Sequence, residues 1–286
     1  MSTGVGMSSC CLSGTKPSPS PCHFVHTNTS LGALHNGTPK GHEEVINGLP
    51  TYVSPSPDQR KTRSIVFISD IFGYKLNNTR LLADQYAAAG FFVYVPDFHN
   101  GDSLPIEFLQ DAEPPLKVRE NLSIVDKGVK TAKVGATLGP WLFKHSESVS
   151  KPLIEGFIRT IKMTPGTNTV GAIGFCWGGR YAILMAHELV DAAVAQHPSL
   201  VAVPGDFDPV TKPLRLDVGE ADSLLDTKTV GSIQELLAKK QNTEVKVYED
   251  QVHGFALRGD WSSDKDKKAM DDAEKAGIAW FEKYLH

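Results

Sequence analysis

The stretch Val170-Gly-Ala-Ile-Gly-Phe-Cys-Trp-Gly-Gly179 decides the fold. Residues 170–175 have the apolar pattern of a buried strand, and residues 181–186 have that of a buried helix. Between them lies Cys176, a nucleophilic residue, with Gly174 two positions before it and Gly178 two positions after it. Glycine is needed there because the backbone turns too sharply for Cβ atoms at these positions. We therefore predict Cys176 on a strained strand-to-helix turn with its sulfur clear of the sheet. The alternative is a buried structural cysteine in a glycine-rich bend.

The sequence on either side of this stretch alternates between strand patterns and helix patterns. The predicted strands are 64–69, 91–95, 192–195, 214–218 and 245–248, and the predicted helices are 78–89, 176–187, 227–240 and 264–284. This alternation predicts an α/β fold, a mainly parallel sheet flanked by helices on both faces. A hairpin is expected over 43–53, because Asn47-Gly48 suits a tight turn with positive φ at both positions.

Two segments fall outside the alternation. Residues 1–42 are rich in Gly, Ser, Pro, Thr and His, so we expect a mobile N-terminal leader before a single domain over 43–286. Residues 103–150 are too long for a loop, and we expect a helical insertion there over the edge of the sheet. The sequence leaves open whether this insertion covers a pocket or only packs against the domain.

The composition restricts the classes of function. The 286 residues are 41% hydrophobic and 22% charged, which predicts a globular chain. The net charge of −4 lacks the positive excess typical of proteins that bind nucleic acid. Since no apolar run approaches the roughly 20 residues that span a bilayer, and the leader lacks the apolar segment of a secretory signal, we expect no membrane insertion.

The cysteine content favours a reducing compartment. Four cysteines in a chain of this length do not make a disulfide framework, so we expect a cytoplasmic protein. Cys10, Cys11 and Cys22 lie in the leader, and their spacing with His23 matches no zinc pattern. We expect ordinary thiols there and no metal, with palmitoylation of the adjacent pair as an open alternative.

A cysteine nucleophile needs a histidine base and an acid that orients the histidine. In this topology the order along the chain is nucleophile, acid, histidine, on loops that follow later strands. Asp222 follows the strand at 214–218, and His253 follows the strand at 245–248. Both positions are at the carboxyl ends of parallel strands, where functional residues collect. We predict that Asp222 and His253 complete a triad with Cys176.

Other acids and another histidine compete for these roles. Asp217 lies inside its strand, and Glu220 and Asp226 fit surface positions. His197 also follows a strand and is the one serious rival to His253 as the base. We prefer His253 because it alone satisfies the chain order.

These motifs resemble the dienelactone hydrolase family of α/β-hydrolases, over about residues 43–286. Four segments carry the resemblance: the cysteine elbow at 174–179, the acid loop at 219–222, the histidine loop at 253–256, and residues 69–73, where family members usually carry E-I-F-G. The resemblance implies an α/β-hydrolase fold, a triad of Cys176, Asp222 and His253, and no cofactor. It also implies an oxyanion hole built from the backbone N–H groups of Ile71 and Trp177.

The same resemblance suggests roles for two further residues. Asp70 stands where the family usually has a glutamate, which in bacterial members alternates between an arginine and the cysteine thiol. Asp70 is thus a candidate to modulate the thiol, with a turn-capping role as the alternative. Bacterial members bind the substrate carboxylate with arginines, but none follows Pro96-Asp97 here. Arg258 is the candidate for a substrate contact, and a surface ion pair is its alternative.

The leader motifs at 9–14 and 37–41 are similar to the start of fungal and yeast members, some of which belong to polyketide gene clusters. The resemblance implies a cytoplasmic hydrolase of small activated esters, lactones or thioesters, acting as a monomer or homodimer in secondary metabolism or in aromatic and lactone degradation. A thiolate nucleophile does not suit peptide amides. Two alternatives stay open: a non-catalytic small-molecule-binding α/β-hydrolase, and a redox-responsive thiol protein in which Cys176 is oxidised reversibly.

Overall fold

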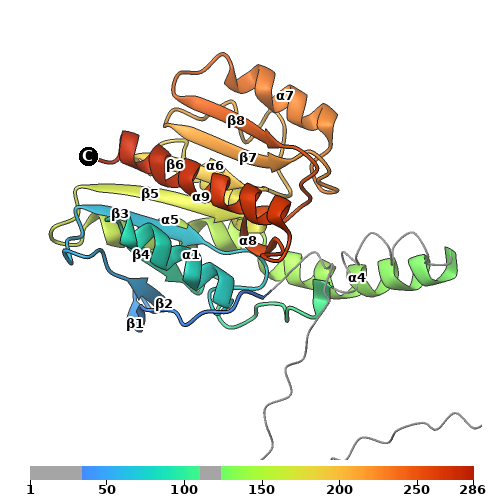
Figure 1. Cartoon of the computed structure of the whole chain (residues 1–286), viewed down its shortest axis with the longest axis horizontal. Helices are drawn as coiled ribbons and strands as arrows, with labels where there is room; N and C mark the ends of the chain where they lie inside the picture. Colours follow the sequence, from blue (N-terminus) through green and yellow to red (C-terminus); the bar gives the residue numbers. More distant parts are fainter. Residues whose placement is uncertain (1–33, 110–123) are drawn as a thin grey trace, which may run out of the picture.

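A computed structural model describes residues 34–109 and 124–286, and Figure 1 shows a central sheet covered by helices. The sheet has eight strands in the order β1-β2-β4-β3-β5-β6-β7-β8. The strands are β1 (His42–Ile46), β2 (Leu49–Ser54), β3 (Arg63–Ile68), β4 (Phe92–Pro96), β5 (Thr169–Phe175), β6 (Ala192–Gln196), β7 (Leu214–Gly219) and β8 (Thr243–Tyr248). Strand β2 pairs in antiparallel fashion with β1 on one side and with β4 on the other, and β3 to β8 run parallel. The predicted mainly parallel sheet is confirmed.

Helices cover both faces of this sheet. They are α1 (Asn77–Ala88), α4 (Ile124–Lys144), α5 (Glu147–Lys162), α6 (Trp177–Met185), α7 (Thr227–Leu237), α8 (Phe255–Arg258) and α9 (Asp264–Tyr284). Alternate residues of β3 enter two different cores: Val66 and Ile68 pack with α5 and α6, whereas Ile65 and Phe67 pack with α1 and α9. Figure 1 shows α1 and α9 together on one face. In the described ranges, no helix is both long enough and apolar enough to cross a membrane.

The predicted hairpin is present at the edge of the sheet. Residues of β1 and β2 pair from His42 opposite Val53 to Ile46 opposite Leu49. The turn between them has φ of 51° at Asn47 and 79° at the following glycine, which is the positive-φ conformation expected for this dipeptide.

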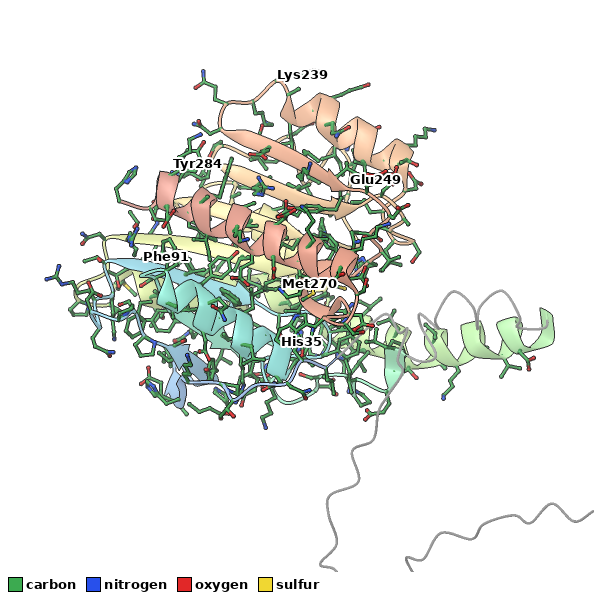
Figure 2. All side chains as sticks on the ribbon, in the orientation of Figure 1. His35, Phe91, Lys239, Glu249, Met270 and Tyr284 are labelled. Carbon is green, nitrogen blue, oxygen red and sulfur yellow. The ribbon has the colours of Figure 1, made fainter. Side chains whose placement is uncertain are left out.

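The ordered contacts begin before the predicted start of the domain at residue 43. The backbone N–H of His35 donates to Oδ1 of Asn78 at 2.9 Å, and its ring Nε2 donates to the carbonyl oxygen of Gly259 at 2.9 Å. The His35 ring also stacks on Trp261 with centroids 4.0 Å apart, and Figure 2 shows His35 near α1. Residues 34–41 thus pack against the domain, and the predicted leader boundary at 42 lies too late. The predictions for the leader cysteines lie outside the described residues.

The segment predicted as a helical insertion contains α4 and the start of α5, with residues 110–123 outside the described chain. Helix α5 was not predicted, because Pro152 and Gly156 interrupt its helical pattern. It forms nevertheless, since Ile154, Phe157 and Ile158 are fully buried against the sheet. Packing of this apolar stripe outweighs the low helix propensity of the proline and the glycine. Helix α5 completes the crossover from β4 to the parallel strand β5.

Candidate active site

Cys176 lies at the sharp turn between β5 and α6, as predicted. Its backbone has φ 53° and ψ −115°, a conformation that is strained for a residue with a Cβ atom. The turn also presses against the end of β3, because a Cβ on Gly178 would lie 2.0 Å from the carbonyl oxygen of Ile68. The sequence therefore needs glycine at this position. The strained turn places the Cys176 side chain at the N-terminal end of α6, where the helix dipole favours negative charge.

The loops after β7 and β8 bring Asp222 and His253 together. Nδ1 of His253 donates to Oδ2 of Asp222 at 2.9 Å and lies 3.1 Å from its Oδ1. The backbone N–H of Leu224 donates to the same Oδ1 at 2.8 Å, which fixes the carboxylate. The two loops approach closely because residue 219 is glycine: a Cβ on Gly219 would lie 2.4 Å from the carbonyl oxygen of Gln251.

His253 is placed to hold a positive charge. Burial alone would lower its pKa, but the Cys176 sulfur and the Asp222 carboxylate outweigh burial and raise the pKa of His253 to about 10. Nε2, on the opposite side of the ring from Asp222, has no conventional hydrogen-bond partner in the described part of the chain. This arrangement stabilises the imidazolium form of His253, with Nδ1–H directed at the Asp222 carboxylate.

The rival acids have other tasks. Asp217 is fully buried within β7 and binds Arg215 in an ion pair of 2.7 Å. Glu220 is exposed and accepts a hydrogen bond at 3.0 Å from the backbone N–H of Asp250, in the loop that follows β8. Asp226 caps α7 by accepting a hydrogen bond from the backbone N–H of Thr229 at 2.7 Å. None of these three carboxylates hydrogen-bonds His253 among the described residues.

Asp70 is fully buried in the turn after β3 and uses both carboxylate oxygens. Oδ1 accepts a hydrogen bond from the backbone N–H of Phe72 at 3.0 Å, and Oδ2 accepts one from Nη1 of Arg258. Burial raises the pKa of Asp70, and the Arg258 guanidinium opposes that rise by stabilising the charged form. The predicted turn-capping contact is therefore present. Arg258 has an exposed fraction of 4%, so a surface ion pair is the wrong description of it, and its guanidinium is already bound.

The two backbone segments expected to form the oxyanion hole lie side by side. Ile71 belongs to the turn after β3, and Trp177 is the first residue of α6. The start of α6 touches the end of β3 at Ile68 and Ser69, which brings the two segments together. The first N–H groups of a helix have no partner within the helix, so the N–H of Trp177 is suited to bind a developing oxyanion.

Comparison with known proteins identifies the group of proteins that share this arrangement. The sequence model of the dienelactone hydrolase family matches residues 49–285. The chain belongs to the dienelactone hydrolase family. It is accordingly a hydrolase of ester or lactone bonds. The hydrolase pyvD of Aspergillus violaceofuscus is 27% identical to it over 256 residues, which cover 89% of this chain and 94% of pyvD. A human carboxymethylenebutenolidase homolog is 26% identical over 272 residues, covering 93% and 98% of the two chains.

Solved structures share the fold of this family member. The crystal structure of a putative dienelactone hydrolase from Klebsiella pneumoniae superposes with a TM-score of 0.64 at 20% identity, covering 85% of this chain and 98% of that one. A dienelactone hydrolase from Anabaena variabilis gives a TM-score of 0.58 at 16% identity, with coverage of 86% and 99%. The predicted α/β-hydrolase fold is confirmed.

His197, the rival to His253 as the base, packs against the His253 ring in this member of the dienelactone hydrolase family. Its side chain is fully buried, and its ring packs edge-to-face on His253 with centroids 5.1 Å apart. Burial lowers the pKa of His197 well below its usual range, and the charge on His253 lowers it further. A neutral His197 thus supports the ring of His253 by packing, which the sequence pattern did not reveal.

Ser199 is a residue of the site that the sequence analysis missed. Its Oγ lies 3.6 Å from Sγ of Cys176, and its backbone N–H donates to the Cys176 carbonyl oxygen at 3.0 Å. The only sequence signal was its place just after the carboxyl end of β6.

A cavity of about 170 Å³ lies against Trp177, the residue after Cys176 in the chain, and Cys176 is not part of its lining. Its lining includes Leu142, His145, Trp177, Arg180, Tyr181 and Leu200. Because Leu142 belongs to the C-terminal end of α4 and His145 follows it, the predicted insertion lines a pocket rather than only packing against the domain. Arg180 is occupied by ion pairs of 2.7 Å to both Asp206 and Glu147.

His99 lies close to this cavity, in the loop that follows β4. It packs edge-to-face on Trp177 with centroids 4.8 Å apart and on Trp141 with centroids 5.1 Å apart. Burial, reinforced by the charge on His145, lowers the pKa of His99 to about 3. His99, two positions after Asp97, is therefore neutral at physiological pH.

Proposed function

We propose that this member of the dienelactone hydrolase family hydrolyses small, uncharged, activated esters, lactones or thioesters through an acyl-enzyme on Cys176. The observation that carries the proposal is the pairing of a cysteine on a strained elbow with a buried histidine whose Nδ1 donates to Asp222 at 2.9 Å. Sequence similarity to a hydrolase and to carboxymethylenebutenolidase homologs supports the same class of reaction.

In the first half-reaction the Cys176 thiolate attacks the substrate carbonyl carbon and forms a C–S bond. The oxygen that becomes negative is bound by the N–H groups of Ile71 and Trp177. As the tetrahedral intermediate collapses, the C–O bond to the leaving group breaks, and the leaving oxygen takes the proton of the His253 imidazolium. The products of this step are a thioester on sulfur, the free alcohol and a neutral imidazole held by Asp222.

In the second half-reaction the neutral His253 takes a proton from water, and the oxygen of that water attacks the thioester carbonyl. The C–S bond breaks, its electron pair returns to sulfur, and the carboxylic acid leaves. The thiolate–imidazolium pair is then restored. Asp222 keeps Nδ1 protonated throughout, so that Nε2 is always the nitrogen that exchanges protons.

We propose an uncharged substrate because the nearby arginines are already paired with carboxylates and the nearby His99 is neutral. Arg258 is bound to Asp70, and Arg180 is bound to Asp206 and Glu147. His99 is neutral because it is buried. The cavity of about 170 Å³ against Trp177 is comparable to one that holds a benzene-sized molecule, and we propose that it receives the part of a small substrate that extends away from Cys176. We accordingly do not assign the substrate carboxylate to Arg258.

The wider setting is part of the same proposal. Similarity to the fungal hydrolases pyvD and tropI supports a role in secondary metabolism, and degradation of aromatic compounds or lactones is the alternative setting. A thiol nucleophile must stay reduced, which supports a cytoplasmic protein. We propose a monomer or homodimer that needs no cofactor.

A rapid-mixing experiment tests this function. Wild-type enzyme mixed with excess p-nitrophenyl acetate is expected to release one equivalent of nitrophenolate per chain in a burst, followed by slower turnover. Cys176→Ala is expected to show neither phase, because the acyl acceptor is gone. Asp226→Ala, a loss of an exposed helix cap, is the matched control and retains both phases. Turnover by Cys176→Ala would refute the mechanism.

The choice between charged and uncharged substrates needs a second comparison. Mono-p-nitrophenyl succinate has the same leaving group as p-nitrophenyl acetate but carries a carboxylate. We expect a kcat/KM at least about tenfold lower for the charged ester, since the nearby cations are already paired. A higher kcat/KM for the charged ester would show that Arg258 or Arg180 is available to the substrate.

A further inference from the structure

Ser199 is the side chain whose hydroxyl lies against the sulfur of Cys176. Its Oγ is 3.6 Å from Sγ, within the range of a hydrogen bond to sulfur, and its exposed fraction is 4%. The backbone N–H of Ser199 is used separately, because it donates to the carbonyl oxygen of Cys176. Backbone and side chain therefore make two different contacts with the same residue.

Among the described residues, Sγ of Cys176 is the hydrogen-bond partner of the Ser199 hydroxyl. A thiolate accepts hydrogen bonds and cannot donate one, so a serine beside it acts as the donor. Asp70, the carboxylate expected to modulate the thiol, has both oxygens bound by Phe72 and Arg258. Ser199 is therefore better placed than Asp70 to act directly on the sulfur.

We propose that Ser199 is a catalytic residue, whose hydroxyl donates a hydrogen bond to the Cys176 thiolate. This inference rests on the proposed function, because it requires Cys176 to be the nucleophile. Hydrogen bonds to an ionised partner are the stronger kind in proteins, and in a buried site they favour the charged form of the acceptor. In this proposal the thiolate has two donors, the His253 imidazolium and the Ser199 hydroxyl.

The same hydrogen bond acts twice in the catalytic cycle. It stabilises the thiolate before attack, and it weakens when the sulfur becomes a neutral thioester. During deacylation the C–S bond breaks and the electron pair returns to sulfur, so the hydroxyl stabilises the leaving thiolate again. Deacylation is the step in which this stabilisation lowers the barrier, because the charge on sulfur develops in its transition state.

The test measures how readily the thiol ionises, without any substrate. Iodoacetamide reacts with thiolates, so the rate at which the peptide that contains Cys176 is alkylated, followed by mass spectrometry apart from the peptides of Cys10, Cys11 and Cys22, reports the thiolate fraction of Cys176 against pH. Ser199→Ala keeps the backbone N–H and removes only the hydroxyl. We expect its half-maximal rate at a pH about one unit higher than in the wild type, which corresponds to about tenfold less thiolate on the acid side. Ser199→Thr, which keeps the hydroxyl, is expected to restore most of the difference.

Ser54→Ala is the matched control. Ser54 is also a buried serine with an exposed fraction of 4%, and its hydroxyl donates to a carboxylate on α1 at 2.6 Å, away from the site. We expect this variant to lose stability without any change in the alkylation profile. If Ser199→Ala does not fold, Ser199→Gly serves in its place, because it also retains the backbone N–H.

The outcomes separate this inference from the proposed function. An unchanged alkylation profile in Ser199→Ala, beside a wild-type thiol that ionises at neutral pH and loses this property in His253→Gln, would overturn the role of Ser199 alone. A wild-type thiol that ionises like a free cysteine, with or without His253, would overturn the proposed thiolate–imidazolium pair. A shift in Ser199→Ala that Ser199→Thr fails to restore would also count against the hydroxyl as donor.

Discussion

Two buried carboxylates of this site each hold a cation from the segment that follows β8, yet they differ in what they can do. Asp222 binds His253, and Asp70 binds Arg258, which lies five positions further along the chain. All four side chains are nearly inaccessible to solvent. The histidine can give up and regain a proton in the course of a reaction, whereas the arginine guanidinium stays protonated in proteins. The first pair can therefore move protons, and the second can only fix positions.

The two pairs also differ in whether they contain an atom that lacks a hydrogen-bond partner. Nε2 of His253 has no conventional partner among the described residues, which leaves it available to sulfur and to water. Both oxygens of Asp70 are bound, one of them by a backbone N–H in the turn that also carries Ile71. The arginine pair thus holds the turn that carries Ile71, which we propose for the oxyanion hole, against α8. The two pairs are similarly buried and charged, but Asp222–His253 can transfer protons, whereas Asp70–Arg258 only holds two segments together.

Replacing His253, the residue that transfers protons, is expected to have the largest effect on activity. In His253→Gln the side chain can still hydrogen-bond but cannot carry a proton, so kcat/KM for p-nitrophenyl acetate is expected to fall by at least about 10³-fold. The variant is expected to fold, which circular dichroism checks, but to unfold at a lower temperature than the wild type, because the buried Asp222 carboxylate loses its cation. A loss of kcat/KM of less than tenfold would mean that His253 is not the base, and His197 would then be the candidate for that role.

Breaking the arginine pair is expected to affect stability more than chemistry. Arg258→Met leaves a buried carboxylate without its cation, and we expect the free energy of unfolding in urea to fall by about 3–5 kcal/mol. In the double variant Asp70→Asn/Arg258→Met no charge is left unpaired, so most of this stability should return. If the double variant is as unstable as the single one, the contacts of Arg258 other than the ion pair hold the turn.

The pH dependence of activity separates the two pairs further. The pKa of His253 is raised to about 10, so its imidazolium persists through neutral pH and is lost as the pH rises through that value. The wild-type kcat/KM is expected to decline on the alkaline side near pH 10 rather than near 6.5. Asp222→Asn removes the carboxylate that raises this pKa and should move the alkaline limb to lower pH, whereas Asp70→Asn should move it less. Equal shifts in the two variants would contradict the distinction.

The smallest effect is expected at His197, whose ring nitrogens have no hydrogen-bond partner in the described residues. If its role is packing against His253, His197→Phe should retain kcat/KM within about threefold, because an aromatic ring still fills the space. His197→Ala should cost more, since a cavity beside His253 lets its ring move. Steady-state kinetics of both variants measure this. An equal loss in both variants would indicate that the imidazole itself takes part.

The chain order of the functional loops made the main part of the site predictable. Strand ends of a parallel sheet meet at one edge, so the residues after β5, β7 and β8 had to lie together once the alternation was recognised. Cys176, Asp222 and His253 could be located in this way. The glycines at 174, 178 and 219 reinforced the prediction, because each sits where another backbone approaches too closely for a Cβ atom.

Contacts between distant segments could not be predicted in this way. Asp70 and Arg258 are separated by 188 positions, and a local pattern says nothing about such a pairing. Arg258 was predicted as a substrate contact because bacterial family members bind the substrate carboxylate with arginines, and its buried partner Asp70 has no signal in the local sequence. Ser199 was missed because a serine in a loop has no periodic signal. Helix α5 was missed because Pro152 and Gly156 lower its local propensity, whereas its burial depends on the whole sheet.

The most direct test of the central claim is to find where the acyl group goes. Wild-type protein mixed with p-nitrophenyl acetate and quenched in acid during the burst is examined by intact mass and then by peptide mapping. We expect one acetyl group per chain, attached to the peptide that contains Cys176, with greater accumulation in Asp222→Asn because deacylation is slowed. No acetyl group should be found in Cys176→Ala. Steady turnover in Cys176→Ala, or acetylation at a different residue during wild-type turnover, would contradict the account.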